Sequence, residues 1–324
     1  MYRMVVRELG GPSSLERQEL DAVPAGPGEV VIDVHAIGCN FFDILITQGK
    51  YQVRPELPFA PGAEIAGTVR EVGKEVERFS AGDRVSALLA YGGFASTVAA
   101  PVERVFAMPP QMTFEEAAAL GLVYQTSYVG LVHRAHLRAG ETLLVHAAAG
   151  GVGLAAVQIG AALGARVIGT AGSSDKLELV KKNGADVVIN YRDEDWVERV
   201  KELTDGRGAD VIYDPVGGDT FDLSTKCIAF EGRILIIGFA SGRIPSAKMS
   251  RVLVKNFSLV GLHWGLYFEK NTQVLQDAQD AILGLYAAGK IAPVVSATYP
   301  LLDAKVALDA LGARKTKGKV VLIP

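Results

Sequence analysis

The stretch Thr142-Leu-Leu-Val-His-Ala-Ala-Ala-Gly-Gly-Val-Gly153 decides the fold of this chain. An apolar run ends at His146, small residues follow, and apolar positions resume from Leu154. This order predicts a buried strand, a tight turn and a helix. Small residues let the backbone approach a pyrophosphate, and a helix N-terminus holds an anion with its free N–H groups and dipole. We therefore predict a dinucleotide-binding turn that includes Ala149, Gly150, Gly151, Val152 and Gly153.

The turn matches the G-x-G-x-x-G pattern incompletely. Gly150 and Gly153 occupy its second and third glycine positions, while Ala148 replaces the first. A lone match is weak evidence, but this one stands between a strand and a helix, and a second strand follows. The alternative is a glycine-rich turn that is packed closely for structural reasons only.

The following residues alternate between strand and helix patterns. The expected strands are Thr142–His146, Arg166–Thr170, Val187–Ile189, Val211–Tyr213, Arg233–Ile237 and Ser258–Gly261. The expected helices are Gly151–Leu163, Asp175–Lys182, Glu194–Leu203 and Asp219–Ile228. Such alternation predicts an α/β domain with a doubly wound parallel sheet and right-handed crossovers.

The segments on either side of this alternation differ from it. The first hundred residues read as short strands separated by Gly and Pro turns, without a lasting helical period. Thr113 with Glu115 and Glu116 is typical of a helix start. After Trp264 we expect the elements Lys270–Ala288, Val294–Tyr299, Asp303–Leu311 and Lys319–Ile323. We assign them to the first domain, so that residues 123–263 are inserted between 1–122 and 264–324.

Composition limits the classes of partner and compartment. A formal net charge of −3 and a pI near 6.0 argue against nucleic acid or an anionic membrane as a general partner. No apolar run approaches the ~18–20 residues of a membrane span. The N-terminus lacks the features of a secretion signal. Only Cys39 and Cys227 are present, which favours a reducing compartment. We expect a cytoplasmic protein.

The end of the second strand bears on the choice between NADP and NAD. A site that prefers NAD usually places an acid there, about 20 residues after the first glycine. This strand tip has no carboxylate; Ser173, Ser174 and Lys176 offer two hydroxyls and a cation that suit a 2′-phosphate. Asp175 leaves an alternative open. It is either a solvent-facing acid in a helix first turn or a ribose ligand, and in the second case NADH would be accepted.

Further cofactor contacts are expected at the carboxyl ends of other strands, where ligands bind in doubly wound folds. Tyr191 and Arg192 follow the third strand and are candidates for the same phosphate, or else belong to an ordinary solvated strand exit. The loops after the fourth and fifth strands should lie along the ribose and nicotinamide. Their candidate residues are Val216, Gly217, Phe239, Ala240 and Ser241.

Several motifs along the chain carry a family resemblance. They are His146–Gly153, Ala36–Asp43, Pro61–Gly67, Ala81–Val85, Tyr213–Gly218, Gly238–Gly242 and Gly318–Leu322. Together they resemble the medium-chain dehydrogenase/reductase superfamily, in its zinc-free quinone oxidoreductase (zeta-crystallin-like) branch. The resemblance implies a Rossmann-type doubly wound parallel sheet inserted into a β-rich GroES-like catalytic domain.

The residues that hold zinc in related alcohol dehydrogenases are replaced here. Asn40 stands where those enzymes have a cysteine, and Ala63 where they have a histidine. Two cysteines cannot supply the lobe of four that holds their structural zinc. His133 and His136 have ligand-like spacing, but a catalytic zinc needs about three protein ligands and no third is near. We expect no metal site.

The resemblance also implies roles for individual residues. Asn40, Asp43 and Tyr51 would line the nicotinamide end of a cleft as catalytic candidates, and Asn40 would also bind the cofactor. Tyr51 is the best candidate proton donor or orienter, with a packed aromatic as the alternative. Thr126 resembles a threonine that touches the diphosphate or nicotinamide. Lys317 or Lys319, of which Lys319 is preferred, would reach the cofactor from the C-terminal segment unless it is merely solvated.

Without zinc there is no strong Lewis acid to polarise a simple carbonyl, so the substrate must accept hydride readily. We expect an NADPH-dependent quinone oxidoreductase. One alternative is a reductase of 2-alkenals, enones or short enoyl thioesters such as acryloyl-CoA. Another is a catalytically weak, NADPH-binding, crystallin-like protein. The exposed edge strand Ser258–Gly261 predicts a homodimer.

Overall fold

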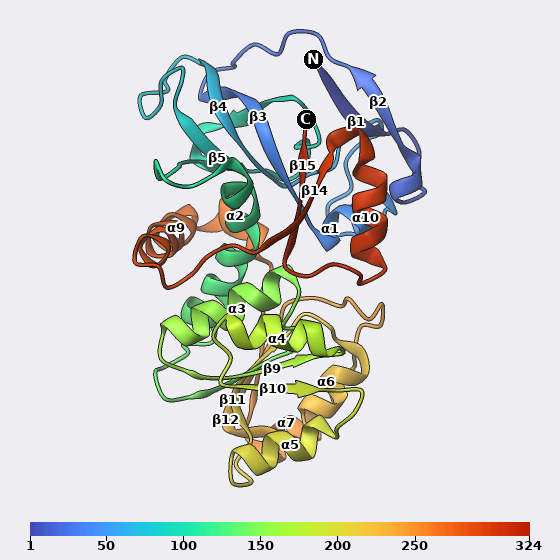
Figure 1. Cartoon of the computed structure of the whole chain (residues 1–324), viewed down its shortest axis with the longest axis vertical. Helices are drawn as coiled ribbons and strands as arrows, with labels where there is room; N and C mark the ends of the chain where they lie inside the picture. The colour runs from blue at the N-terminus through green and yellow to red at the C-terminus, as the bar shows by residue number, and fades with distance from the viewer. The chain divides into compact units, whose positions relative to one another are not determined.

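The computed structural model describes residues 1–324 and divides into two compact units, Met1–Leu122 with Pro293–Pro324, and Val123–Ala292. The second unit contains one parallel sheet of six strands (Figure 1). The strands are β8 (Thr142–Val145), β9 (Arg166–Ala171), β10 (Val187–Asn190), β11 (Ala209–Asp214), β12 (Ile228–Ile236) and β13 (Ser258–Gly261). Their order is β10-β9-β8-β11-β12-β13, and every neighbouring pair is parallel. The predicted doubly wound fold is confirmed.

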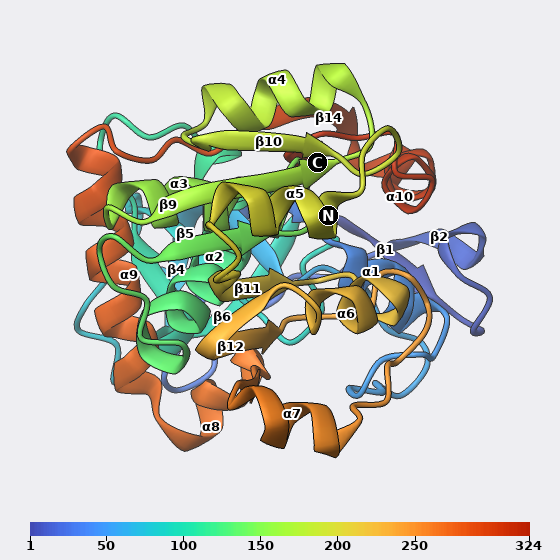
Figure 2. The same ribbon diagram turned by 90° about the horizontal axis from the view of Figure 1, so that it is seen from below.

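Helices cover both faces of this sheet. They are α3 (Gly151–Ala162), α4 (Ser174–Lys182), α5 (Trp196–Leu203), α6 (Gly218–Ser224) and α7 (Met249–Lys255). Figure 1 shows α3 and α4 on one face and α5, α6 and α7 on the other. In Figure 2 the labelled strands β10, β9, β11 and β12 follow one another down the view, with α7 beyond β12. The winding reverses between β8 and β11, and ligands bind at such a switch point in doubly wound sheets.

The first unit is built around a second sheet. Its strands are β3 (Glu29–Cys39), β4 (Glu64–Val72), β5 (Arg84–Leu88), β6 (Thr97–Pro101), β7 (Val105–Ala107), β14 (Val295–Pro300) and β15 (Lys319–Ile323). The order is β14-β15-β3-β4-β5-β7, and β6 also pairs with β3. The C-terminal β15 runs antiparallel to β3, with Val321 opposite Gly38. This pairing brings Lys319 to the end of β3.

Smaller elements complete the first unit. They are the hairpin β1 (Tyr2–Val6) and β2 (Leu15–Glu19), and the helices α1 (Phe41–Thr47) and α10 (Ala304–Gly312). The sequence predicts no lasting helix in the first hundred residues, so α1 is a correction. It has only seven residues, too few for a helical period to show, and a side chain stabilises its start because the Asp43 carboxylate accepts a hydrogen bond from the Asn40 N–H.

The expected helix start at Thr113 is confirmed. Helix α2 (Phe114–Tyr128) follows Thr113, whose hydroxyl accepts from the Glu116 N–H at 3.1 Å while the Glu116 carboxylate accepts from the Thr113 N–H at 2.9 Å. A π-helical stretch, Val129–Arg134, continues it. The expected helix over residues 219–228 is too long: α6 ends at Ser224 because Ile228 already belongs to β12.

The second unit extends further along the chain than the sequence predicted. It ends at Ala292 and not at residue 263, and therefore includes α8 (Tyr267–Lys270) and α9 (Thr272–Ala287). The reason is packing: Leu275 and Ala278 of α9 share a buried cluster with Val129. Gln279 of α9 also accepts a hydrogen bond from Gln125 at 2.8 Å. None of the helices combines the length and apolar character that a membrane crossing requires.

Candidate functional site

The residues Ala147–Gly153, called here the glycine turn, join β8 to α3. Ala147 adopts a left-handed conformation with φ +47°. The Ala148 N–H donates to the Thr170 carbonyl of β9 at 3.0 Å, and the Gly150 N–H donates to the Ala147 carbonyl at 3.0 Å. These bonds fix the turn against the sheet.

Gly153 is required by close packing. A Cβ atom at this position would lie 2.3 Å from the Ala147 carbonyl oxygen and 2.8 Å from the Ala148 Cα. The missing first glycine is compensated on β9, because a Cβ at Gly169 would lie 3.1 Å from the Ala148 methyl group. Gly169 therefore leaves the space that Ala148 occupies. The turn therefore forms even though Ala148 replaces the first glycine of the G-x-G-x-x-G pattern.

The start of α3 is open to an anion. Gly150 is its N-cap residue and has no side chain to cap the first-turn N–H groups. The Ser127 hydroxyl holds this first turn, since it donates to the Val152 carbonyl at 3.1 Å and lies 2.9 Å from the Tyr213 hydroxyl. The uncapped helix start and the close backbone approach fit a cofactor diphosphate. Thr126, next to Ser127 on α2, is nearly buried.

The residues predicted to determine the preference for NADP or NAD lie beside the end of β9. The Ser173 hydroxyl donates to the Asp175 carboxylate at 2.5 Å, and Asp175 lies in the first turn of α4. Lys176 is half-buried in the same turn. Tyr191, 44% exposed, lies against Gly172, because a Cβ there would be 2.5 Å from the Tyr191 hydroxyl. Tyr191 therefore lies beside the tip of β9.

The loops after β11 and β12 are hydrogen-bonded to each other. The Ala240 N–H donates to the Pro215 carbonyl at 3.1 Å, and the Ser241 N–H donates to the Val216 carbonyl at 3.0 Å. Asp214, which was not predicted, shapes the first loop: its carboxylate accepts from the Val216 and Gly217 N–H groups at 2.8 and 2.9 Å. Burial raises the pKa of Asp214, while these two hydrogen bonds lower it. The predicted residues of these loops, Phe239 included, lie at the carboxyl edge of the sheet.

In the first unit, Asn40, Glu64 and Lys319 form a buried cluster. The Asn40 amide donates to Glu64 at 2.8 Å and to the Gly38 carbonyl at 3.3 Å. The Lys319 ammonium donates to the Asn40 side-chain oxygen at 2.7 Å, to the Cys39 carbonyl at 2.9 Å and to the Glu64 carboxylate. The other Glu64 oxygen accepts from the Leu122 N–H at 2.9 Å. All three side chains are nearly inaccessible to solvent.

This cluster bears on the roles predicted for two of its members, Asn40 and Lys319. An ammonium has three N–H donors and a side-chain amide has two, and all five are used within the chain. Lys319 therefore has no donor left for a cofactor phosphate, and the Asn40 amide has none for a substrate. Both residues position the backbone around the end of β3. These bonds favour a positioning role, and the direct contacts predicted for the two residues stay predictions.

Glu64 is the member of this cluster that sequence reasoning missed. The signal was present in the quoted motif Pro61–Gly67, where a single acid stands in a small and apolar stretch. Such a residue is seldom fully buried unless it is paired. The partner could not be identified locally, because Lys319 lies 255 positions away.

Asp43 also has a positioning role. Its carboxylate accepts from the Asn40 N–H at 2.7 Å and from the Gly62 N–H at 3.0 Å, and the side chain is fully buried. Burial raises the pKa of Asp43 to about 7, against the opposing influence of these hydrogen bonds and of Lys319. The carboxylate links the start of α1 to the segment before β4. These contacts give Asp43 a structural role, and its catalytic role stays a prediction.

Tyr51 remains available for chemistry. Its ring packs edge-to-face on Phe42, with centroids 4.7 Å apart, and adjoins a small apolar cluster of Val6, Ile46 and Phe59. No hydrogen bond to the Tyr51 hydroxyl is present within the chain. Partial burial raises the pKa of this phenol, so it stays protonated as a donor near neutral pH.

His146 is not a proton donor. The ring lies between Thr170 and Ser224, with hydrogen bonds of 3.1 and 3.0 Å, and is fully buried. Burial lowers its pKa to about 3, so the ring is neutral at physiological pH.

Nowhere in the chain do three or more His, Cys, Asp or Glu side chains group so that they could hold a metal ion, and this includes the surroundings of His133 and His136.

Comparison with known proteins agrees with this geometry. Residues 26–110 match the alcohol dehydrogenase GroES-like domain, and residues 151–280 match the zinc-binding dehydrogenase domain. The chain is 44% identical to "Quinone oxidoreductase-like protein 2 homolog" of Nematostella vectensis over 99% of its own length and 88% of that protein. It belongs to the quinone oxidoreductase family. The resemblance seen in the sequence motifs is confirmed.

Two solved structures place the fold within this family. The Escherichia coli quinone oxidoreductase in complex with NADPH has a TM-score of 0.94, 36% identity and coverage of 100% of both chains. The CurK enoyl reductase has a TM-score of 0.91 and 30% identity, and the match covers 99% of this chain and 98% of that one. The expected combination of a GroES-like domain and a Rossmann-type sheet is confirmed.

Proposed function

We propose that this protein is an NADPH-dependent quinone oxidoreductase that transfers hydride without zinc. The observation that carries the proposal is the glycine turn, whose backbone leaves room for a diphosphate and whose helix start is uncapped. The match over the whole chain to a quinone oxidoreductase solved with NADPH supports the same cofactor.

The preference for NADPH over NADH is proposed from the tip of β9. Asp175 already accepts the Ser173 hydroxyl, in a position typical of a helix first-turn acid. No other acid stands at the strand tip to hold a ribose 2′-hydroxyl. Lys176 and Tyr191 flank the same tip and suit a 2′-phosphate.

When bound, NADPH supplies the hydride. The protein holds the diphosphate at the start of α3 and fixes that turn through Ser127 and Tyr213. The Tyr51 hydroxyl, protonated and without a partner in the chain, donates a hydrogen bond to the substrate oxygen. A quinone needs no stronger electrophile than this.

A second function is favoured by one comparison. The likeness to the CurK enoyl reductase keeps 2-alkenals, enones and short enoyl thioesters as alternative substrates. The two functions share the hydride and differ in the acceptor. The third alternative, a crystallin-like protein, would bind NADPH but would not oxidise it with any acceptor.

The deciding experiment is NADPH oxidation, followed by absorbance, with a panel of acceptors. We expect turnover with benzoquinone or phenanthrenequinone. Reduction of crotonaldehyde or acryloyl-CoA, with failure of both quinones, would replace the proposal with the enoyl reductase. Tyr51→Phe should lower kcat by about tenfold or more while leaving the NADPH Kd unchanged; the control is Tyr2→Phe, at the opposite end of β1 from Val6.

We further propose a cytoplasmic homodimer. Strand β13 pairs only with β12, so its outer edge is open. The neighbouring helix α7 exposes Leu253 and Val254 at 74% and 77%. Both cysteines are buried free thiols, consistent with a reducing compartment. Sedimentation equilibrium should give twice the chain mass of 34.3 kDa; a single-chain mass would exclude the dimer.

A further inference from the structure

A cavity outside the predicted cofactor contacts lies between α6, α7 and the loop that connects β12 to α7. This α6–α7 pocket has a volume of 620 Å³, and its lining comes entirely from the second unit. That volume is within the range of about 300–1,000 Å³ typical of small-molecule sites. It is far larger than a single phosphate or carboxylate requires, which leaves room for a ligand body beyond one anionic group.

The interior of the pocket is apolar. Leu223 of α6, Ala247 of the loop and Val252 of α7 are partly exposed to it, and the buried rings of Phe221 and Phe257 lie beneath them. This aliphatic lining favours an aromatic or branched hydrocarbon over a sugar or a polar amide.

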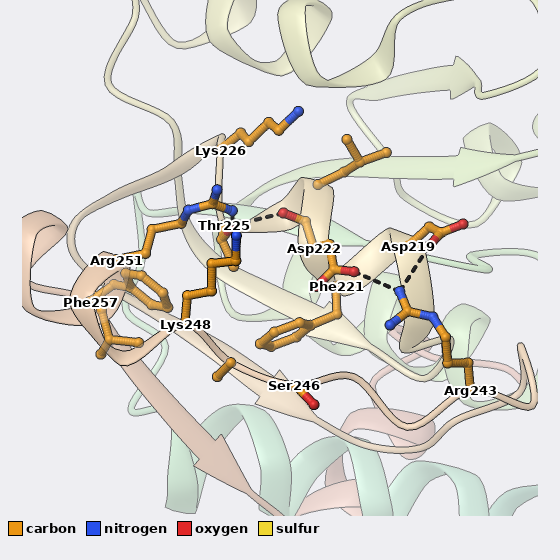
Figure 3. Close-up of a pocket in the computed structure, with 13 residues that line it drawn as sticks. Asp219, Phe221, Asp222, Thr225, Lys226, Arg243, Ser246, Lys248, Arg251 and Phe257 are labelled. Atoms are coloured by element: carbon orange, nitrogen blue, oxygen red, sulfur yellow. Dashed lines mark hydrogen bonds and ion pairs between the residues drawn. The ribbon is translucent and has the colours of Figure 1, made fainter.

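The charges around this interior are unbalanced. Four cationic side chains line the pocket, against only two acidic ones, Asp219 and Asp222. Both acids are paired with Arg243, at 2.8 and 2.6 Å. Figure 3 shows this ion pair at one end of the pocket, with Lys248 and Arg251 at the other.

The cations away from Arg243 have no acidic partner. Arg251 donates to the uncharged Thr225 hydroxyl at 2.8 Å. Lys226 and Lys248 make no ion pair or side-chain hydrogen bond. Three positive charges thus adjoin an apolar cavity without neutralisation, and they would favour one anionic group on a ligand.

We propose that the α6–α7 pocket binds an organic anion with an aromatic or branched apolar body, such as an aryl carboxylate or sulfonate. The hydrocarbon lies on Leu223, Ala247 and Val252, and the anionic group faces Lys226, Lys248 and Arg251. The site shares no residue with the glycine turn, and it does not depend on which acceptor the enzyme reduces.

The test uses two fluorescent probes on the full chain saturated with NADPH. Anilinonaphthalene sulfonate carries the aromatic body and the anion, while N-phenylnaphthylamine has a similar body without charge. We expect one saturable sulfonate site, with at least about tenfold tighter binding than the neutral probe. No saturable binding, or equal affinity of the two probes, would overturn the proposal.

Variants locate the site. Lys248→Gln and Lys226→Gln should each weaken sulfonate binding by about three- to tenfold and leave the neutral probe unaffected. Ser246→Trp, on the exposed loop, should fill the cavity and abolish binding of both probes. The matched control is Lys290→Gln, at an exposed position after α9, which should change nothing.

Two outcomes would assign the probe elsewhere. Displacement of the sulfonate by NADPH would show that it occupies the cofactor site. Retention of full affinity in both Lys248→Gln and Ser246→Trp would place it on another surface, such as an apolar face between two copies of the chain. Either result contradicts the proposal.

Discussion

The glycine turn and the buried cluster of Asn40, Glu64 and Lys319 differ in how their hydrogen-bond donors are used. The turn is made of backbone and leaves the first-turn N–H groups of α3 without a side-chain cap. The cluster is made of side chains and uses every N–H donor of Asn40 and Lys319 within the chain. Open donors make a binding site, whereas satisfied donors make a support. Charge and polarity alone do not distinguish the two.

The largest expected effect comes from a variant that disrupts the buried cluster of Asn40, Glu64 and Lys319. Lys319→Met leaves the Glu64 carboxylate buried without its cation, and should lower the free energy of unfolding by about 3–5 kcal/mol. Denaturant titration measures this. Lys315→Met, at an exposed position, is the control. The double variant Lys319→Met with Glu64→Gln should be more stable than the single one; a loss below about 1 kcal/mol in the single variant would contradict the account.

The second-largest expected effect comes from a variant that adds a methyl group within the glycine turn. Gly153→Ala places a methyl group 2.3 Å from the Ala147 carbonyl oxygen, so the turn must shift. We expect the NADPH Kd to rise by about 30- to 100-fold, equivalent to about 2–3 kcal/mol. Gly284→Ala is matched, because no atom lies within 4 Å of its Cβ. Equal affinities of the two variants in a fluorescence titration would argue against the turn as the cofactor site.

A pH experiment sharpens the comparison within the first unit. Burial raises the pKa of Asp43 from 3.8 to about 7, so the native state binds this proton more tightly than the unfolded state. The stabilisation is fully present below pH 3.8 and is lost as the pH rises through about 7. The stability of the wild type relative to Asp43→Asn should therefore fall by about 2 kcal/mol between pH 5 and 7. Unfolding titrations at the two pH values test this; a difference that grows with pH would contradict it.

The smallest effect concerns cofactor choice at the tip of β9. Lys176→Gln should weaken NADPH binding by about three- to tenfold and leave NADH binding unchanged, because only NADPH has the 2′-phosphate. Lys182→Gln, at the far end of α4, serves as the control. If both cofactors weaken equally, Lys176 supports the turn and does not read the phosphate.

The sequence was sufficient for the features that depend on local pattern. All six strands of the parallel sheet and the glycine turn were predicted, because buried strands and turns have signatures a few residues long. The seven-residue helix α1 was missed for lack of length. The unit boundary was misplaced because the packing of Leu275 on Val129 joins residues far apart in the sequence.

The candidate site divides in the same way. Residues of the turn and the strand tips follow from their place in the strand order. The roles of Asn40, Asp43 and Lys319 do not follow from strand order, because their hydrogen-bond partners come from other strands and from the C-terminus. A family motif identified these three residues as important. It could not distinguish a contact with the cofactor from a buried hydrogen bond.

The NADPH Kd of Lys319→Met tests the central claim most directly. The measurement is a fluorescence titration under conditions where circular dichroism shows the variant to be folded. If Lys319 only supports the end of β3, its Kd should stay within about twofold of the wild type. A loss of tenfold or more, approaching that of Gly153→Ala, would show that Lys319 contacts the cofactor and would contradict the assignment of the buried cluster.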